Sequence, residues 1–450
     1  MKPFKASNRN QPFLLPPSIQ DWLPREHLAR FIVEIVEQLD LSKIESQYSG
    51  KGKDAYSPQV MLSLLFYGYA TGVFSSRKIE RATYDSIAFR YISANTHPDH
   101  DTIANFRKRF LDELTDLFVQ ILSVAQEMGV LKVGKVSLDG TKVKANASKH
   151  KALSYSHATK LQKQLEDEVQ KLLEKAKTAD NKEDCDGMNI PNEIARRKDR
   201  LEVIKAAKEK IEQRAKERHK QELQEYEDKI KKREAKEKLT GKKTSGKKPQ
   251  PPINKEPNPK DQVNLTDEES RIMPVSGGGY MQAYNAQASV EHDSRLIVHQ
   301  HVTQNVNDKK EMVPTLKWFK ENPFLMPDSM LADAGYFSDE NVKQCTNEKI
   351  TPYISFGKEQ HNQPLEDRFQ EVQAIPEDAT DVEKMKHRLQ TKEGKEIYAQ
   401  RKSVVEPVFG VMKHVMGFRQ FMLRGFEKSK GEWNLICIAY NLKRLHVIAT

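Results

Sequence analysis

The stretch KVSLDGTKVKANASKHK, residues 135–151, decides how the chain is divided and where chemistry is expected. Its apolar residues Val136 and Leu138 predict a core β-strand that ends at Asp139. The cations that follow this carboxylate are Lys142, Lys144, Lys149, His150 and Lys151. An acid at a strand end often serves as a helix cap or a solvated loop charge, but one surrounded by cations also suits a site for a phosphate.

Charge is concentrated in one part of the sequence. The 450 residues include 74 Lys and Arg against 64 Asp and Glu, a formal net charge of +10. Residues 229–260 hold twelve of these basic residues and three Glu, which places +9 in this stretch alone. Such a segment predicts an anionic polymer as partner, although solvated charge runs are also common.

Cysteine content and hydropathy exclude several classes of protein. The three cysteines, Cys185, Cys345 and Cys437, are too few and too scattered for a disulfide framework or a zinc site. The N-terminus lacks the apolar core of a signal peptide, and the longest apolar stretch is too short to span a bilayer. We therefore expect a soluble cytoplasmic protein that does not engage a membrane.

Residues 1–130 are predicted to form an all-helical domain. In REHLARFIVEIVEQLD, residues 25–40, the apolar residues recur at helical spacing. Another helix is predicted from a cap at Asp101 to a stop at Gly129. Short helices joined by a turn that contains Gly72 fit either a helix-turn-helix or a plain helical bundle.

The period changes from Lys135 onward. Strand-like segments are predicted at 135–145, 280–292, 295–304, 328–337 and 350–357. Helices separate the later strands, and a last helical region is predicted from Tyr398, with a break near Gly417. This order predicts a mixed α/β sheet flanked by helices, built from residues 131–151 and 271–450.

Residues 152–270 interrupt this predicted sheet domain. Their long charged stretches, poor in aromatic residues, predict an antiparallel helical hairpin or coiled coil. A Lys/Pro/Gly-rich tract, residues 240–262, follows and is predicted to be a disordered linker.

Three acidic residues are candidates for chemistry: Asp139, Asp333 at the end of the fourth strand, and Glu406 at the start of a helix. If the first and fourth strands are neighbours, the two aspartates lie side by side. Together with a carboxylate from a covering helix, they can hold two hard divalent cations. Two cations about 4 Å apart activate a nucleophile and stabilise the leaving oxygen in phosphoryl transfer.

Basic residues near these acids predict contacts with a phosphate backbone. Lys142 and Lys144 follow Asp139 directly. Lys413 lies seven residues after Glu406, two helical turns along the same face. It would hold a DNA phosphate near the metals or be solvated.

Several segments together resemble one protein family. VSLDGTKVKANAS, MLADAGYFSDEN and YAQRKSVVEPVFGVMKHVMGFRQFMLRG are similar to the DDE transposases of bacterial insertion sequences. The similarity is to the branch with a Tyr-Arg-Glu-Lys signature around the catalytic glutamate. HPDHDTIANFRKRF, in the helical region, resembles the N-terminal domain of the same proteins.

The resemblance implies an RNase H-like catalytic domain with Asp139, Asp333 and Glu406 as the metal-binding triad. Two Mg²⁺ ions, or Mn²⁺ in their place, would serve water attack at the ends of the element and then 3′-OH attack on target DNA. The partners would be double-stranded DNA, as terminal inverted repeats and as target, bound by a homodimer. The location would be the bacterial cytoplasm, at the nucleoid.

The signature itself departs from the family at one point. Tyr398, Arg401 and Lys413 match its tyrosine, arginine and lysine. The common spacing has three residues between arginine and glutamate, whereas four separate Arg401 from Glu406, and Lys402 would satisfy the usual spacing.

Two other functions are compatible with parts of the sequence. One is a catalytically inactive, transposase-derived DNA-binding protein, and the other is a scaffold whose coiled coil is the functional part. Retention of all three acids favours the enzyme. In that case the helical domain would contribute to recognising the inverted repeats, and the basic insertion would bind DNA or pair two subunits.

Overall fold

The computed structural model divides into two compact units, Met1–Asn146 with Met273–Thr450, and Ala147–Ile272. Within the residues that the structure describes, no helix has the length and apolarity to cross a membrane. These residues are 18–48, 54–179, 190–241, 243–244, 246–252, 255–275, 277–357, 375–376 and 378–450.

The first unit begins with short helices, which confirms the helical N-terminal region. They are α1 (Ile19–Trp22), α2 (Leu28–Glu37), α3 (Ser42–Glu45), α4 (Pro58–Ala70), α5 (Ser76–Asp85), α6 (Ile87–Ile92), α7 (His100–Arg109) and α8 (Leu114–Glu127). Every residue of α4 from Met61 to Ala70 is buried, so this helix forms the centre of the bundle.

The single helix predicted from Asp101 to Gly129 is wrong. The chain forms α7 and α8 with a break between them, and Asp99 caps α7 by accepting the backbone N–H of Thr102 at 2.8 Å. Phe110 and Leu111 in the break are buried. Burial of these two side chains fixes a turn that helical periodicity does not reveal.

A mixed sheet follows, as predicted, with six strands where five were expected, because β4 was not predicted. Its strands are β1 (Lys135–Lys144), β4 (Arg271–Pro274), β5 (Tyr280–Glu291), β6 (Ile297–Thr303), β7 (Ser329–Ala332) and β8 (Thr351–Ile354). The order is β4-β5-β1-β7-β8, with β6 also paired to β5. β1 runs antiparallel to β5 and parallel to β7, and β7 runs parallel to β8.

The first strand does not end at Asp139, contrary to the prediction. β5 pairs with β1 from Val136 as far as Lys144, whereas β7 pairs with it only from Lys135 to Leu138. Because backbone groups in the interior need partners, β1 continues for as long as β5 supplies them. Asp139 therefore lies within the strand, at the point where the parallel neighbour stops.

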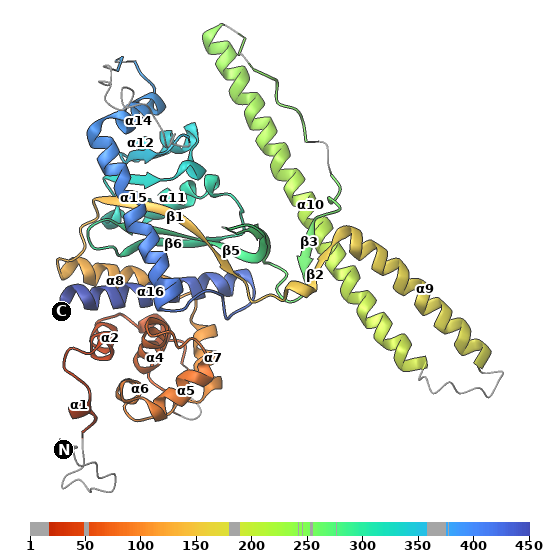
Figure 1. Ribbon diagram of the computed structural model, residues 1–450, viewed down its shortest axis with the longest axis horizontal. Helices are drawn as coiled ribbons and strands as arrows, with labels where there is room; N and C mark the ends of the chain where they lie inside the picture. The colour runs from red at the N-terminus through yellow and green to blue at the C-terminus, as the bar shows by residue number, and fades with distance from the viewer. Residues whose placement is uncertain are drawn as a thin grey trace, which may run out of the picture. The chain divides into compact units, whose positions relative to one another are not determined.

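Helices cover the sheet. They are α11 (Met312–Glu321), α12 (Asp339–Asn347), α14 (Asp381–Gln390), α15 (Lys392–Gly410) and α16 (Phe426–Ala449). α15 packs against β1, β5 and β7 and is seen crossing the sheet in Figure 1. It begins at Lys392, after a Thr391 cap and earlier than the predicted Tyr398. α16 packs against β6, α4 and α8.

A buried carboxylate links the helical bundle to the C-terminal segment. Glu432 of α16 accepts the Tyr69 hydroxyl at 2.7 Å and the backbone N–H groups of Met422 and Leu423 at 2.8 and 3.0 Å. Arg107 of α7 donates to the same Tyr69 hydroxyl at 3.0 Å. Burial raises the pKa of the Glu432 carboxyl, because the charged form is removed from water. The hydrogen bonds that it accepts offset this cost of burial.

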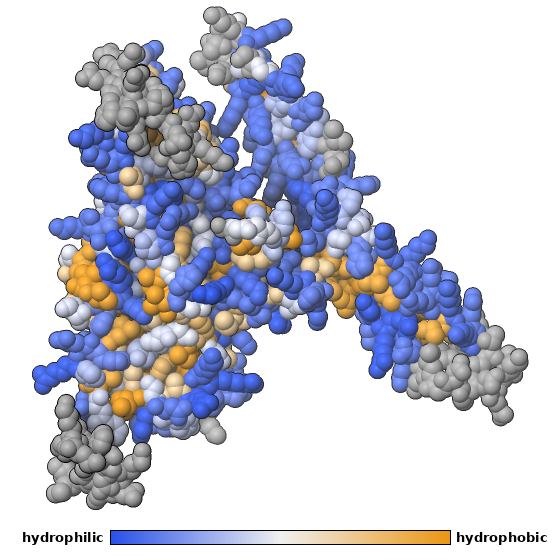
Figure 2. Space-filling model, viewed as in Figure 1, coloured by the Kyte–Doolittle hydropathy of each residue, from blue (hydrophilic) through white to orange (hydrophobic). Residues whose placement is uncertain are grey.

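The second unit is a helical hairpin, as predicted. α9 (Tyr155–Ala179) and α10 (Ile190–Thr240) pack together, and β2 (Ala152–Ser154) pairs with β3 (Gln262–Asn264) at their base. Its buried core consists of Leu153, Ala158, Leu165, Ile204, Ala207, Ile211 and Val263. In the view of Figure 2, hydrophilic residues cover most of the second half of α10.

The Lys/Pro/Gly-rich tract that follows α10 is more ordered than predicted. Arg233 donates to the carbonyl oxygens of Thr244, Gly246 and Lys247 at 2.7 to 3.1 Å. Near the end of the tract, Arg218 of α10 and Asp261 form a two-pronged ion pair at 2.9 and 3.1 Å. Arginines spaced along one helix hold the returning chain, a long-range effect that composition does not indicate.

Replacement of Glu432 by alanine is expected to lower the free energy of unfolding by roughly 3–5 kcal/mol, because buried donors lose their acceptor. Glutamine keeps one acceptor oxygen and should cost about 1–2 kcal/mol. Urea denaturation measures both variants, with Glu427→Ala on the exposed side of α16 as the control. Equal losses for Ala and Gln would refute the role given to the hydrogen bonds.

Candidate active site

The register of two strands brings Asp139 and Asp333 together. Leu138 of β1 is paired with Ala332, the last residue of β7, in a parallel ladder. The residue that follows each member of this pair is an aspartate, Asp139 or Asp333. This confirms that the first and fourth predicted strands are neighbours. Asp333 also caps the 3-10 turn Ala334–Tyr336 by accepting the Gly335 N–H at 2.8 Å.

Asp139 is a carboxylate in an unfavourable position. Its pKa is raised to about 6: burial is the main cause, Arg401 and the Gly140 N–H act in the opposite direction, and the negative charges of Asp333 and Asp308 add to the rise. An ionised carboxylate that is partly removed from water and faces like charges is stabilised by a nearby cation.

Arg401 of α15 supplies such a cation. Its Nη1 lies 3.2 Å from Asp139 Oδ2, and its side chain is only 8% exposed. Its Nε has no hydrogen-bond partner among the described residues. Tyr398, one turn earlier, donates its hydroxyl to the Ala332 carbonyl at 3.4 Å, whereas Lys402 is exposed. The structure thus places Arg401 and Tyr398 against the acid-bearing strands and Lys402 in solvent.

Lys413 reaches β1 from a π-helical turn. The chain changes from α-helix to π-helix over Val411–Val415, so the α-helical spacing used to place Lys413 on the Glu406 face does not apply there. The Lys413 ammonium donates to the Thr141 hydroxyl, two residues after Asp139 on the same face of β1. Burial lowers the pKa of Lys413.

Glu406 stands apart from the two aspartates. It is exposed, and no three Asp, Glu, His or Cys side chains in the described part of the chain converge closely enough to hold a metal ion. Glu406 lies five positions after Arg401, about 140° around the helix, so α15 turns Arg401 and not Glu406 toward Asp139. The structure therefore brings together two of the three predicted ligands.

The chemistry of the two aspartates still fits a hard divalent cation. Carboxylate oxygens are the ligands that Mg²⁺ and Mn²⁺ prefer. Burial and like charges raise the pKa of Asp139, and the positive group that opposes them is Arg401, a monovalent cation. A divalent ion at this edge would offset both the energetic cost of burying the Asp139 carboxylate and its repulsion by the neighbouring carboxylates.

The lysines predicted to bind DNA from β1 are differently placed. Lys142 Nζ lies 3.5 Å from Asp308 Oδ1, and its side chain is only 19% exposed. Lys144 is half-buried, and its carbonyl accepts the Phe421 N–H at 2.9 Å. Lys142 therefore points to a carboxylate within the protein.

Sequence reasoning missed Asp308 and its two amide partners. Asp308 Oδ1 accepts hydrogen bonds from Asn285 Nδ2 at 2.6 Å and from Gln287 Nε2 at 2.8 Å. Asn285 and Gln287 are fully buried in β5. Two polar residues at alternate positions of a core strand were the signal, since buried amides need partners.

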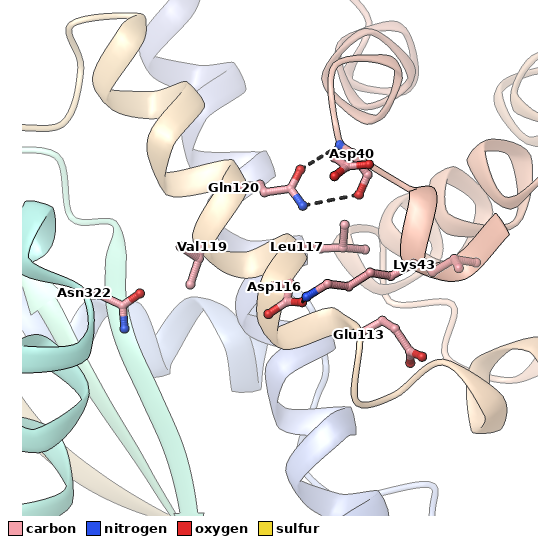
Figure 3. A pocket seen from close by; sticks show the side chains of 9 residues that line it. Asp40, Lys43, Glu113, Asp116, Leu117, Val119, Gln120 and Asn322 are labelled. Carbon is pink, nitrogen blue, oxygen red and sulfur yellow. Dashed lines mark hydrogen bonds and ion pairs between the residues drawn. The ribbon is translucent and has the colours of Figure 1, made fainter. Parts of the chain in front are cut away.

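A surface hollow of about 310 Å³ lies by α3 and α8 and contains none of these residues (Figure 3). Lys43 in it pairs with Asp116, and Gln120 exchanges hydrogen bonds with the backbone of Asp40. Three carboxylates line it, with Lys43 as the one basic lining residue. This charge does not suit a phosphate backbone, so the hollow lies outside the candidate site.

Arg401→Ala should lower the free energy of unfolding of the metal-free protein on the order of 3 kcal/mol at pH 8 and much less at pH 5. The pKa of Asp139 is about 6, so above that pH its ionised carboxylate depends on Arg401, and as the pH falls through 6 it becomes neutral. Urea denaturation in EDTA at both pH values tests this. The adjacent Lys402→Ala serves as control and should change neither value; a pH-independent loss would show that Arg401 acts by packing alone.

Two family models match the chain on either side of its insertion. Transposase domain (DUF772) matches residues 17–109, and Transposase DDE domain matches residues 252–442, a range that includes Asp333, Glu406 and Lys413. No curated protein and no solved structure gives a significant match. The two ranges together cover more than half of the sequence, in the order of helical region and mixed sheet described above. The chain therefore belongs to the DDE transposases of insertion sequences, the enzymes of DNA transposition by mobile elements.

Proposed function

We propose that this transposase cleaves the ends of its insertion sequence and joins them to target DNA, with Asp139, Asp333 and Glu406 as ligands of two Mg²⁺ or Mn²⁺ ions. The observation that carries the proposal is the parallel register of β1 and β7, which sets two aspartates side by side. DDE transposases in general use divalent metal ions, and the carboxylates here fit that chemistry.

Each chemical step exchanges one phosphorus–oxygen bond for another. Water attacks at the end of the element, loses its proton and releases a 3′-OH; this hydroxyl then attacks a phosphodiester of the target. In each case the leaving oxygen takes up a proton. When bound, two divalent cations supply activation of the attacking oxygen and stabilisation of the leaving oxygen. Asp139 and Asp333 would hold them from the sheet, and Glu406, which stands apart in the metal-free structure, would have to turn toward them from α15.

The basic residues orient the DNA. Arg401 neutralises Asp139 in the metal-free protein, and divalent ions would free its guanidinium for a phosphate. Lys413, already anchored at Thr141, lies on the same face of β1 as Asp139. Tyr398, Lys402, Lys142 and Lys144 are assigned weaker roles in DNA contact.

The remaining parts of the chain select and assemble the DNA. We assign recognition of the terminal inverted repeats to the helical region, and binding of DNA without sequence preference to the basic second half of α10. Two ends must be joined in concert, so the working form is a homodimer on double-stranded DNA. It would act in the cytoplasm, at the nucleoid.

The decisive assay uses DNA carrying the inverted repeats that flank the gene. Cleavage and joining are expected in Mg²⁺ and absent in EDTA, and Asp333→Asn should lower the rate at least about 100-fold. Asp328→Asn is the matched control, because Asp328 is exposed and precedes β7 where Asp333 follows it. Tight DNA binding with no cleavage in Mg²⁺ or Mn²⁺ would instead identify a catalytically inactive DNA-binding derivative.

Salt dependence tests the role of α10. In a plot of the logarithm of DNA affinity against the logarithm of salt concentration, the slope reflects the number of phosphate contacts. Joint replacement of the exposed Lys229, Lys231 and Lys238 by alanine should reduce the magnitude of this slope by up to about three, because three phosphate contacts are lost. The same replacement at the exposed lysines of α9, Lys160, Lys163 and Lys171, is the control. Equal effects in the two triple variants would contradict a specific role for the second half of α10.

A further inference from the structure

Asp308 lies outside the predicted triad but lies against both the strand that carries Asp139 and the turn that Asp333 caps. It opens a 3-10 turn, Asp308–Lys310, shortly after β6. Its Oδ1 accepts the amide groups of Asn285 and Gln287, and Lys142 Nζ lies 3.5 Å from the same oxygen. One oxygen of a partly buried carboxylate thus accepts two hydrogen bonds and also faces the Lys142 ammonium.

The first contact is with the backbone next to Asp139. A Cβ atom at Gly140 would lie 2.3 Å from Gln287 Nε2 and 2.9 Å from Asp308 Oδ1. Both distances are shorter than a normal contact, so any larger residue here would displace Gln287 or Asp308. Asp308 and Gln287 therefore pack closely against Gly140, the residue that follows Asp139 in β1.

The second contact is with the turn of Asp333. A Cβ atom at Gly335 would lie 2.9 Å from Asp333 Oδ1 and 3.8 Å from Asp308 Oδ2. The second oxygen of Asp308 thus faces the turn that Asp333 caps. Tyr336, in the same turn, donates its hydroxyl to Gln287 Oε1. Gln287 thus links this turn to the part of β1 that follows Asp139.

We propose that Asp308 is a positioning residue of the phosphoryl-transfer centre, whose carboxylate and two amide partners fix the separation of Asp139 and Asp333. The inference rests on the proposed function, because it concerns the same centre. Asp308 acts through other residues, because its Oδ1 is already occupied by Asn285 and Gln287. Outer partners of this kind hold metal-binding carboxylates in place.

Mn²⁺ binding by the full-length protein, measured by electron paramagnetic resonance without DNA, tests the inference separately from catalysis. Asp308→Ala should weaken Mn²⁺ binding about 10-fold or more. Asp308→Asn should stay within about threefold, because its amide oxygen still accepts from Asn285 and Gln287. Asp293→Asn, an exposed carboxylate in the β5–β6 turn, should have no effect.

Three results would overturn the inference. Equal loss in Asp308→Ala and Asp308→Asn would make Asp308 a direct ligand, and unchanged Mn²⁺ binding with a lowered melting temperature would make it merely structural. If Asp308→Ala did not fold, Asn285→Ala should still weaken binding about threefold, and unchanged binding there would count against the inference. A wild-type protein that bound no Mn²⁺ would, in contrast, remove the proposed function itself.

Discussion

The unequal pairing of β1 on its two sides is the constraint on which the rest of the structure depends. β5 pairs with it to Lys144, but β7 leaves it after Leu138. β1 is therefore paired with a strand along one edge as far as Lys144, whereas its other edge has no partner strand among the described residues from Asp139 onward. A carboxylate at such a position has a fixed backbone on one side and, within the described part of the chain, no neighbouring strand on the other, a combination that a loop does not provide.

Compensation of negative charge organises the surroundings of this edge. Arg401 pairs with Asp139 from α15, and Lys142 pairs with Asp308 from β1 itself, whereas Lys413 donates to the neutral Thr141 hydroxyl. Arg401 and Lys142 are largely buried, so each interacts with its carboxylate more strongly than a surface pair would. The metal-free protein is thus stabilised by side-chain cations at places where carboxylates gather.

The sequence was sufficient for the architecture and for the two aspartates, because alternation and strand order reflect local chemistry. It could not place the end of β1, which depends on a partner strand more than 140 residues away. Nor could it separate Arg401 from Lys402, since one residue of helical phase decides which of them faces Asp139. Asp308 was missed for a similar reason, because its proposed role arises only where the turn after β6 lies against β5, β1 and the turn after β7.

The insertion illustrates how such a protein tolerates growth. The chain departs after β1 and returns shortly before β5, and these two strands are paired, with Lys144 opposite Ala283. The ends of the inserted segment are thus fixed by the sheet, whatever lies between them, and the entropic cost of closing a loop rises only slowly with its length. The hairpin can therefore lengthen, shorten or be exchanged during evolution without shifting the register that aligns Asp139 with Asp333.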